Sequence, residues 1–184
     1  MTFDEVIAGG GVVVFPADTV YGLACDPNDE AAVARLYALK GRPPDKPAAV
    51  MFFDVGQALL PELSPRTRGL MERLLPGAVT LLVPSERFPL AGGAGSLGVR
   101  VPDIAALGSV PVLQSSANVA GGPDARRLED VPEAIRRGAD LVLDGGELPG
   151  TPSTVVDLRA YERGGDLLIV RPGAVPEPVI RSVA

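Results

Sequence analysis

The sequence predicts an α/β fold in which helices pack against a sheet of mixed parallel and antiparallel strands. Short apolar runs rich in Val and Leu recur along the chain, and the Gly and Pro residues between them limit each run to the length of a strand. Helical patterns alternate with these runs early in the chain, whereas later runs follow one another directly. This order does not fit a regular βαβ repeat, so we expect a mixed sheet.

Several expected strands are apolar at successive positions, which is typical of strands buried on both faces. One run is interrupted by Arg100, whose guanidinium would need a partner if it were buried, so we expect it to face a polar cleft. The expected strands are Val12–Phe15, Ala48–Phe53, Val79–Val83, Leu97–Val101, Val112–Gln114, Leu141–Leu143, Thr154–Leu158 and Leu167–Val170.

Three helices are expected between the strands. Glu30–Leu39 places apolar side chains at helical spacing on one stripe. Ser64 and Pro65 supply an N-cap and a proline at the first helical position for a second helix. Glu129–Arg137 has the pattern of a third helix, which is expected to end at Gly138.

We find no repeat, low-complexity tract or linker, so a single domain is expected over residues 1–184, with a short tail at Pro176–Ala184. No apolar stretch approaches the length that crosses a bilayer, and the N-terminus lacks the basic and then apolar order of a signal peptide. We therefore expect a cytoplasmic protein that makes no membrane contact.

Composition excludes several chemistries. The 184 residues include 17 Lys and Arg, 23 Asp and Glu, one Cys and no His, and the net charge is −6. The absence of His excludes a Ser-His-Asp triad and, with Cys25 as the sole cysteine, a zinc site of nitrogen and sulfur ligands. Catalysis would have to rely on Lys, Arg, Ser, Thr, Asn, Asp and backbone amides, with magnesium as the expected metal. The acidic balance argues against a protein whose whole surface binds nucleic acid.

Both lysines of the chain, Lys40 and Lys46, fall in one loop together with Arg42. Gly41 follows the expected helix, and three prolines stiffen the segment after it. A rigid loop that carries three cations is suited to phosphate binding. The same cations could instead complete the C-terminus of the helix, and the spacing alone leaves both interpretations open.

Polar side chains also gather where strands end. Gln114 and Ser116 follow an apolar run and alternate onto one face of the expected strand. Ligands of open α/β sheets bind at the carboxyl ends of strands, although such residues can equally cap a turn. Thr19, Ser153 and Arg171 lie in similar positions. Taken together, the residues predict a site for an anionic small molecule and favour a nucleotide.

Motifs in a fixed order then indicate a family. The segments are Phe15–Leu23 (FPADTVYGL), Lys40–Pro43 (KGRP), Pro76–Thr80 (PGAVT), Val99–Pro102 (VRVP), Ser116–Asn118 (SAN), Pro152–Asp157 (PSTVVD) and Val170–Gly173 (VRPG). By these segments, which run from its first expected strand to its last, the chain resembles the YrdC-like family of threonylcarbamoyl-AMP synthases.

The resemblance implies a twisted mixed sheet with a large concave cavity. It also implies an enzyme that combines ATP, L-threonine and bicarbonate into threonylcarbamoyl-AMP and releases pyrophosphate. The adenylate would serve downstream tRNA-modifying proteins, and magnesium would accompany ATP. The alternative is a non-catalytic module of the same fold that binds a nucleotide or RNA, and weak tRNA binding would then fall on the concave face.

The resemblance also assigns residues, motif by motif. Lys40, Arg42, Ser116 and Asn118 are expected to be catalytic. ATP is expected to contact Arg42, Lys46, Ser96, Ser116 and Arg171, and threonine is expected to contact Thr19, Arg100, Gln114 and Ser153. No residue is assigned to a metal. The chain departs from the family at Met51, where many members have a histidine, and at Asp124, where a serine is common.

Overall fold

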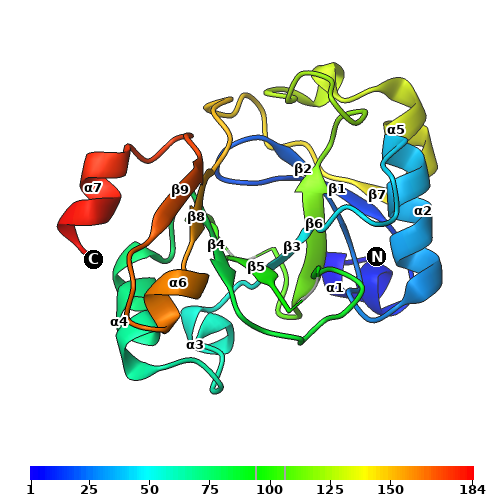
Figure 1. Ribbon diagram of the computed structural model, residues 1–184. Coiled ribbons are helices and arrows are strands. Elements are labelled where there is room, and N and C mark those ends of the chain that lie inside the picture. The colour runs from blue at the N-terminus through cyan, green and yellow to red at the C-terminus, as the bar shows by residue number, and fades with distance from the viewer. Residues whose placement is uncertain (94, 106) are drawn as a thin grey trace.

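In the computed structural model, which describes residues 1–93, 95–105 and 107–184, the strands form one nine-stranded sheet (Figure 1). The strands in chain order are β1 Val13–Pro16, β2 Tyr21–Cys25, β3 Ala49–Met51, β4 Val79–Val83, β5 Leu97–Arg100, β6 Val112–Ser116, β7 Leu141–Val142, β8 Thr154–Asp157 and β9 Leu168–Arg171. The helices are α1 Phe3–Ala8, α2 Glu30–Lys40, α3 Val55–Ala58, α4 Pro65–Leu74, α5 Glu133–Gly138, α6 Arg159–Glu162 and α7 Glu177–Ser182, with a 3₁₀ turn at Leu128–Asp130.

The sheet is mixed, as the order of the elements predicts. Across it the strands lie in the order β7-β1-β2-β6-β3-β5-β4-β8-β9. β7 pairs with β1, β3 with β5 and β4 with β8 in parallel, and the remaining neighbours are antiparallel. Helices flank this sheet: α2 and α5 lie together beside β1 and β2, and α4 and α6 lie together near β4 (Figure 1).

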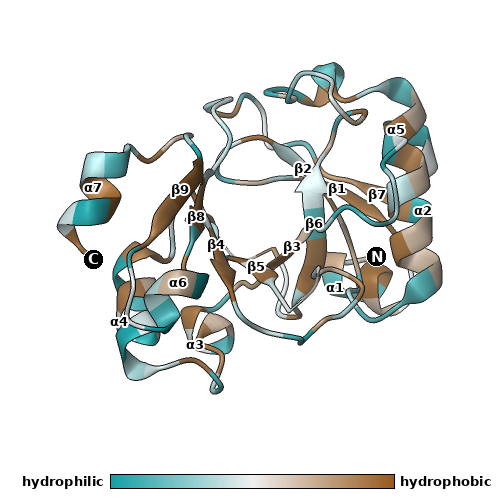
Figure 2. Ribbon diagram, in the orientation of Figure 1, coloured by the Kyte–Doolittle hydropathy of each residue, from teal (hydrophilic) through white to brown (hydrophobic). Residues whose placement is uncertain are grey.

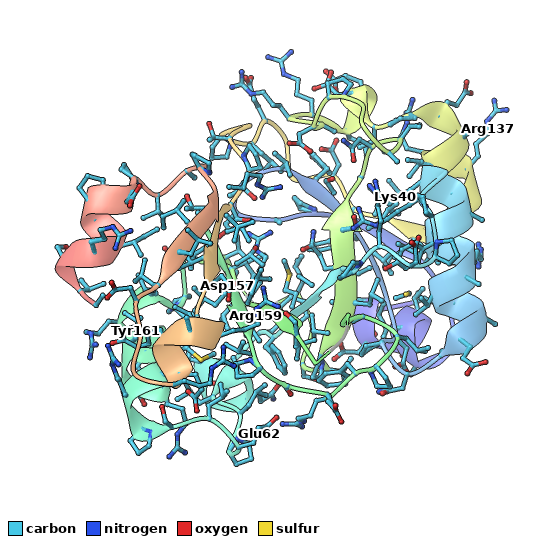
Figure 3. All side chains as sticks on the ribbon, in the orientation of Figure 1. Lys40, Glu62, Arg137, Asp157, Arg159 and Tyr161 are labelled. Atoms are coloured by element: carbon cyan, nitrogen blue, oxygen red, sulfur yellow. The ribbon has the colours of Figure 1, made fainter. Side chains whose placement is uncertain are left out.

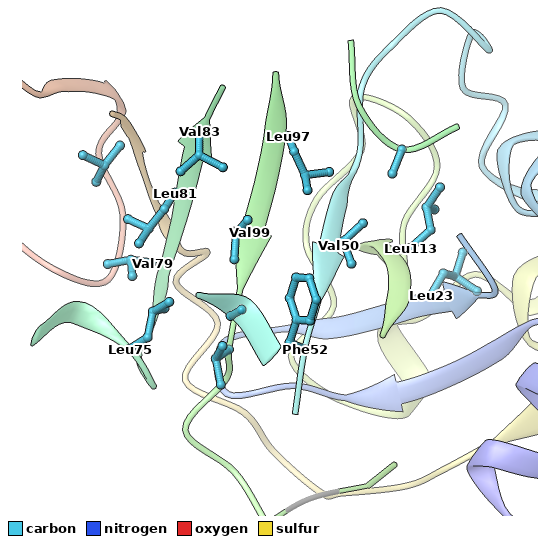
Figure 4. Close-up of a cluster of buried hydrophobic side chains, with 14 of the residues drawn as sticks. Leu23, Val50, Phe52, Leu75, Val79, Leu81, Val83, Leu97, Val99 and Leu113 are labelled. Atoms are coloured by element: carbon cyan, nitrogen blue, oxygen red, sulfur yellow. The ribbon is translucent and has the colours of Figure 1, made fainter. Parts of the chain in front are cut away.

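The two faces of the sheet bury different sets of side chains. The larger core contains inward residues of β3, β4, β5 and β6, such as Val50, Leu81 and Val99 (Figure 4). Apolar side chains of α2, α4 and α6 belong to the same core. The smaller core packs α1 against the opposite face, where Phe3 meets Phe15 edge to face. Because side chains alternate along a strand, the residues between those of the larger core must face the other side. That side carries the site described below.

Some elements differ from the sequence-based expectation. Strand β2 and helices α1, α3, α6 and α7 were not expected. The single helix expected over Glu129–Arg137 is wrong: a 3₁₀ turn and α5 replace it, because Pro132 cannot donate within a continuous helix and starts the second segment instead. Strand β6 continues two residues beyond Gln114, so Ser116 belongs to the sheet.

The C-terminal segment is ordered. The stretch expected to be a tail, Pro176–Ala184, contains α7, and Ile180 on this helix is fully buried in the larger core. None of the helices in the described part of the chain is long and apolar enough to cross a membrane.

Candidate functional site

A cleft of about 440 Å³ opens on the sheet face opposite the larger core. Its floor is formed by the residues that alternate with that core, including Ala49 on β3, Thr80 and Leu82 on β4, and Gly98 on β5. Strand β6 contributes the polar end of its sequence, and in Figure 2 it changes from brown at its start to pale at its tip. The sheet thus presents an apolar face to its core and a partly polar face to the cleft.

The structure brings most of the sequence-predicted residues to this cleft. The predicted residues that line it are Thr19, Arg42, Ser96, Arg100, Gln114, Ser116, Ser153 and Arg171. They come from the ends of several strands and from the loop after α2, which are distant in sequence. The gathering of polar groups expected at strand ends is therefore observed for Thr19, Gln114, Ser116, Ser153 and Arg171, and Arg100 faces the cleft as expected.

Three predicted residues do not line the cleft. Lys46 is exposed and lines a separate cavity beside α2. Lys40 and Asn118 are buried, with 1 % and 8 % of their surfaces exposed, and lie behind the cleft wall. Neither lysine of the chain therefore lines the cleft, whereas Arg42 does.

The turn after α2 separates Lys40 from Arg42. Gly41 caps the helix in the left-handed conformation, at φ 59°, and its N–H donates to the helix carbonyls. Because of this turn, Lys40 points into the protein, whereas Arg42, two residues later, points to the cleft. Arg42 donates from Nη2 to the carbonyl of Pro47 and lies 5.8 Å from the centre of the Tyr37 ring, but its buried Nε has no partner in the described residues.

Arg100 has a partner within the protein. Its Nη2 donates to Oδ1 of Asp18 at 2.5 Å, and the two side chains are only 4 % and 7 % exposed. Burial lowers the pKa of the Arg100 guanidinium, and the carboxylate of Asp18 opposes that shift. The buried Nε of Arg100 has no partner in the part of the chain that the structure describes. Arg100 is therefore a fixed cation whose charge is neutralised within the protein.

The opposite wall of the cleft is held by β8 and β9. Ser153 Oγ lies 2.8 Å from Oγ1 of Thr80, and Arg171 Nη2 donates to the Ser153 carbonyl at 2.7 Å. The chain after β9 passes close to Pro152 at Gly173, where a side chain would not fit, because a Cβ there would lie 2.4 Å from the carbonyl oxygen of Pro152. The hydroxyls and the guanidinium of this wall therefore form one connected group.

Lys40 holds the loop that follows β6. Its Nζ donates to the carbonyl of Ser116, to the carbonyl of Asn118 at 2.8 Å and to Oδ1 of Asn118 at 2.9 Å. Figure 3 shows Lys40 between the end of α2 and the tip of β6. Burial lowers the pKa of Lys40 to about 8, with a further lowering by Arg42 and an opposing effect of Asp124. All three ammonium protons are thus used inside the protein.

The cleft offers little to a metal ion on its own. The described residues contain no group of three or more His, Cys, Asp or Glu side chains that could hold one, and Asp124 is the sole acid among the described residues that line the cleft. A magnesium ion prefers phosphate oxygens, water and one or two carboxylates. The donor set therefore fits an ion that arrives with a phosphate ligand, beside which Asp124 is the one carboxylate among the described lining residues.

Sequence reasoning assigned no role to three polar residues of the cleft, Thr80, Ser115 and Arg159. Thr80 alternates with buried residues of β4, which is a signal that could have placed it on the cleft face. Arg159 carried no such signal. It is paired with Asp157 at 2.6 Å, and Figure 3 shows the two side chains together. Met51, at the position where the family resemblance leads to a histidine, packs in the smaller core and does not line the cleft.

The fold and the cleft define a class of α/β protein with an arginine-lined cleft on one face of a mixed sheet. A family model, Sua5_yciO_yrdC, described as "Telomere recombination", matches residues 5–173. The chain belongs to this family.

Relatives of known name support this family assignment. The chain is 34% identical over 189 residues to the threonylcarbamoyl-AMP synthase of Pyrococcus abyssi, an alignment that covers 96% of this chain and 54% of the relative. It is 40% identical over 167 residues to the threonylcarbamoyl-AMP synthase of Chromohalobacter salexigens, covering 83% of this chain and 89% of the relative. Among solved structures, the Sua5 protein of P. abyssi complexed with L-threonine superposes with a TM-score of 0.86 and 31% identity, over 97% of this chain and 55% of that chain.

Homologues of this chain are thus enzymes by name, and their fold is the one seen here. The chain spans about half the length of the P. abyssi relative.

Proposed function

We propose that this chain synthesises L-threonylcarbamoyl-AMP from L-threonine, bicarbonate or CO₂ and ATP, with release of pyrophosphate. One observation carries the proposal. Four arginines, Arg42, Arg100, Arg159 and Arg171, line the cleft, and Asp124 is the one acid among its described lining residues. Guanidinium groups gathered in a cleft attract anions and donate charge-assisted hydrogen bonds to them, so the cleft suits a ligand with anionic oxygens. The names of the relatives support the choice of ligand.

The reaction suits a chain without histidine. The amine of threonine adds to CO₂ and gives up a proton, and an oxygen of the resulting carbamate attacks the α-phosphorus of ATP. The bond from that phosphorus to the bridging oxygen of the β-phosphate then breaks, and pyrophosphate leaves. Because the nucleophile comes from the substrates, the protein contributes orientation and stabilisation of negative charge. This chemistry makes the chain a nucleotidyltransferase.

The cleft residues divide between the two substrates in this proposal. Arg42 and Arg171 neutralise the triphosphate, and Ser96 adds a contact to a phosphate. Arg100 pairs with the carboxylate of threonine. Magnesium, carried on the phosphates with Asp124 beside it, adds charge neutralisation when bound. The remaining threonine contacts come from Thr19, Gln114 and Ser153.

The test is a threonine-dependent release of pyrophosphate. Protein is incubated with ATP, magnesium and labelled bicarbonate, with and without threonine, and we expect pyrophosphate and a labelled adenylate only when threonine is present. Arg42→Ala is expected to lose both products. Arg137→Ala, which removes an exposed arginine paired with Glu133 away from the cleft, is the matched control and is expected to retain them. Absence of a threonine-dependent product from the unaltered protein would refute the proposal.

We also propose that the adenylate is passed to tRNA-modifying proteins in the cytoplasm. Retention of tRNA that falls with salt, without any turnover of ATP, would instead favour a nucleotide- or RNA-binding module. If the protein retained tRNA and also turned over ATP in a threonine-dependent way, it would be an enzyme that binds RNA as well.

A further inference from the structure

The side chain of Asn118 joins Lys40 to Ser116 behind the wall of the cleft. Its Oδ1 accepts a hydrogen bond from Nζ of Lys40 at 2.9 Å and lies 2.7 Å from Oγ of Ser116. Its Nδ2 donates to the carbonyl of Gly122 at 2.7 Å. Asn118 is 8 % exposed, Lys40 is 1 % exposed, and Ser116 alone of the three reaches the cleft.

The chemistry of these groups fixes the direction of every hydrogen bond. A lysine ammonium can only donate, so the atom of Asn118 that faces it must be the carbonyl oxygen. The amide nitrogen at the other end faces a backbone carbonyl, which can only accept, so both ends of the amide require the same orientation. Because Oδ1 has no proton, the hydroxyl of Ser116 must be the donor in its bond to Asn118.

This direction determines what Ser116 offers to a ligand. A hydroxyl has one proton and two lone pairs, and the proton of Ser116 is committed to Asn118. Only its lone pairs remain for the cleft. An unprotonated phosphate or carboxylate oxygen is itself an acceptor, so Ser116 is mismatched to the triphosphate and matched to an N–H or O–H group.

We propose that Ser116 accepts a hydrogen bond from an N–H or O–H group of the bound ligand, and that Lys40 is a positioning residue that imposes this direction through Asn118 without touching the ligand. The choice of ligand rests on the proposed function: the donor belongs either to the adenosine part of ATP or to threonine. Phosphate oxygens are left to the guanidinium groups. The roles expected from the sequence are thereby altered, since Lys40 acts behind the cleft wall.

The first experiment measures binding of three ligands by calorimetry: ATP, L-threonine and inorganic tripolyphosphate, which has phosphates but no N–H or O–H donor at alkaline pH. Loss of one such hydrogen bond corresponds to about tenfold in affinity. Ser116→Ala is therefore expected to weaken ATP or threonine by about tenfold and to leave tripolyphosphate unchanged. Which of the two weakens identifies the source of the donor. The control is Ser182→Ala, which removes a hydroxyl that also donates to a carbonyl but lies on α7. This variant is expected to keep the affinities for all three ligands.

Either of two results would overturn the assignment of Ser116: a loss of tripolyphosphate affinity as large as that of ATP, or unchanged affinity for both ATP and threonine. If the unaltered protein binds neither ATP nor threonine, the proposed function fails instead.

The second experiment needs no ligand and tests Lys40. In the unaltered protein the side-chain amide protons of Asn118 are held from both ends, so their exchange with water, followed by nuclear magnetic resonance, is expected to be slow. Lys40→Met removes one end and is expected to accelerate that exchange at least severalfold, while amide protons of α4 keep their rates. Equal Asn118 rates in the two proteins would refute the positioning role. Loss of the α4 protection as well would indicate a purely structural role and would also refute it.

Discussion

At the scale of single residues, the cleft is governed by how its cations are neutralised. Arg100 is paired with Asp18 and Arg159 with Asp157, whereas Arg42 donates to a backbone carbonyl, lies by the Tyr37 ring and forms no ion pair with another described residue. A cation that already has an anionic partner binds a second anion less strongly than one that has none. The proposed division of roles follows: Arg42 neutralises the highly charged triphosphate, and Arg100 orients a single carboxylate.

The pair of Arg100 and Asp18 gives a prediction that separates stability from binding. Arg100→Met should destabilise the protein by about 3–5 kcal/mol, because it leaves the carboxylate of Asp18 buried without a partner. The double variant Asp18→Asn with Arg100→Met removes both charges and should recover most of that loss. Urea unfolding measures the free energies.

Threonine binding should not recover in the double variant, since the guanidinium that would bind the carboxylate is still missing. Calorimetry with threonine checks this point. A double variant that is stable and binds threonine as tightly as the unaltered protein would show that Arg100 does not contact the carboxylate.

At the scale of elements, the sequence predicts strands better than it predicts side-chain direction. Strand β4 matches the expected Val79–Val83 because its apolar run is bounded on both sides by turn residues. Strand β2 was missed because its Gly and Ala residues lack the branched side chains typical of strands, although the whole strand is buried. Helix α1 carried a signal that could have been used, since Thr2 and Glu5 form a capping box.

For the candidate site too, the sequence predicts the positions of residues better than the directions of their side chains. The positions at strand ends were predictable because the pattern of alternation places them on one face of the sheet. The direction of Lys40 was not, because it depends on acceptors at Ser116 and Asn118, which lie 76 and 78 residues away in the sequence. Contacts of that kind are decided by the packing of α2 on the sheet and leave no local pattern.

The turn at Gly41 gives a prediction at this scale. Gly41→Ala should lower the free energy of unfolding by about 1 kcal/mol, because the left-handed conformation at φ 59° disfavours a side chain although no atom lies within 4 Å of the added Cβ. Gly69 lies inside α4 with ordinary helical geometry, so Gly69→Ala should instead raise stability by about 0.5–1 kcal/mol. Urea unfolding of the two variants measures both signs. Equal effects would contradict the role of the turn.

At the scale of the whole molecule, an acidic chain carries a cleft of the opposite sign. The net charge is −6, yet Arg42, Arg100, Arg159 and Arg171 line the cleft and Asp124 is the one acid among its described lining residues. Cations gathered in a cleft attract anions from solution, and salt screens that attraction. The surrounding acidic surface should disfavour polyanions that cannot enter the cleft.

This charge distribution predicts that salt affects the two substrates differently. The dissociation constant of ATP should rise severalfold between about 50 and 300 mM salt, because its phosphates rely on screened cations. Threonine has no net charge at neutral pH, so its dissociation constant should change much less. Calorimetry at the two salt concentrations provides the comparison, and an equal change for both substrates would contradict the attraction proposed here.

The single cysteine reports on the integrity of the same sheet. Cys25 lies on β2 within the larger core and is fully buried, and burial, assisted by Asp26 and Asp29, raises the pKa of its thiol to about 12. The reactive species is the thiolate, so a disulfide reagent at pH 8 should react with the folded protein far more slowly than with protein in urea, where the pKa returns to about 8.5. If reaction requires global unfolding, its rate follows the unfolded population. Gly41→Ala, which costs about 1 kcal/mol, should then accelerate labelling about fivefold although it lies on another element. Labelling that is fast in the folded protein, or unchanged by Gly41→Ala, would mean that β2 opens locally without the rest of the sheet.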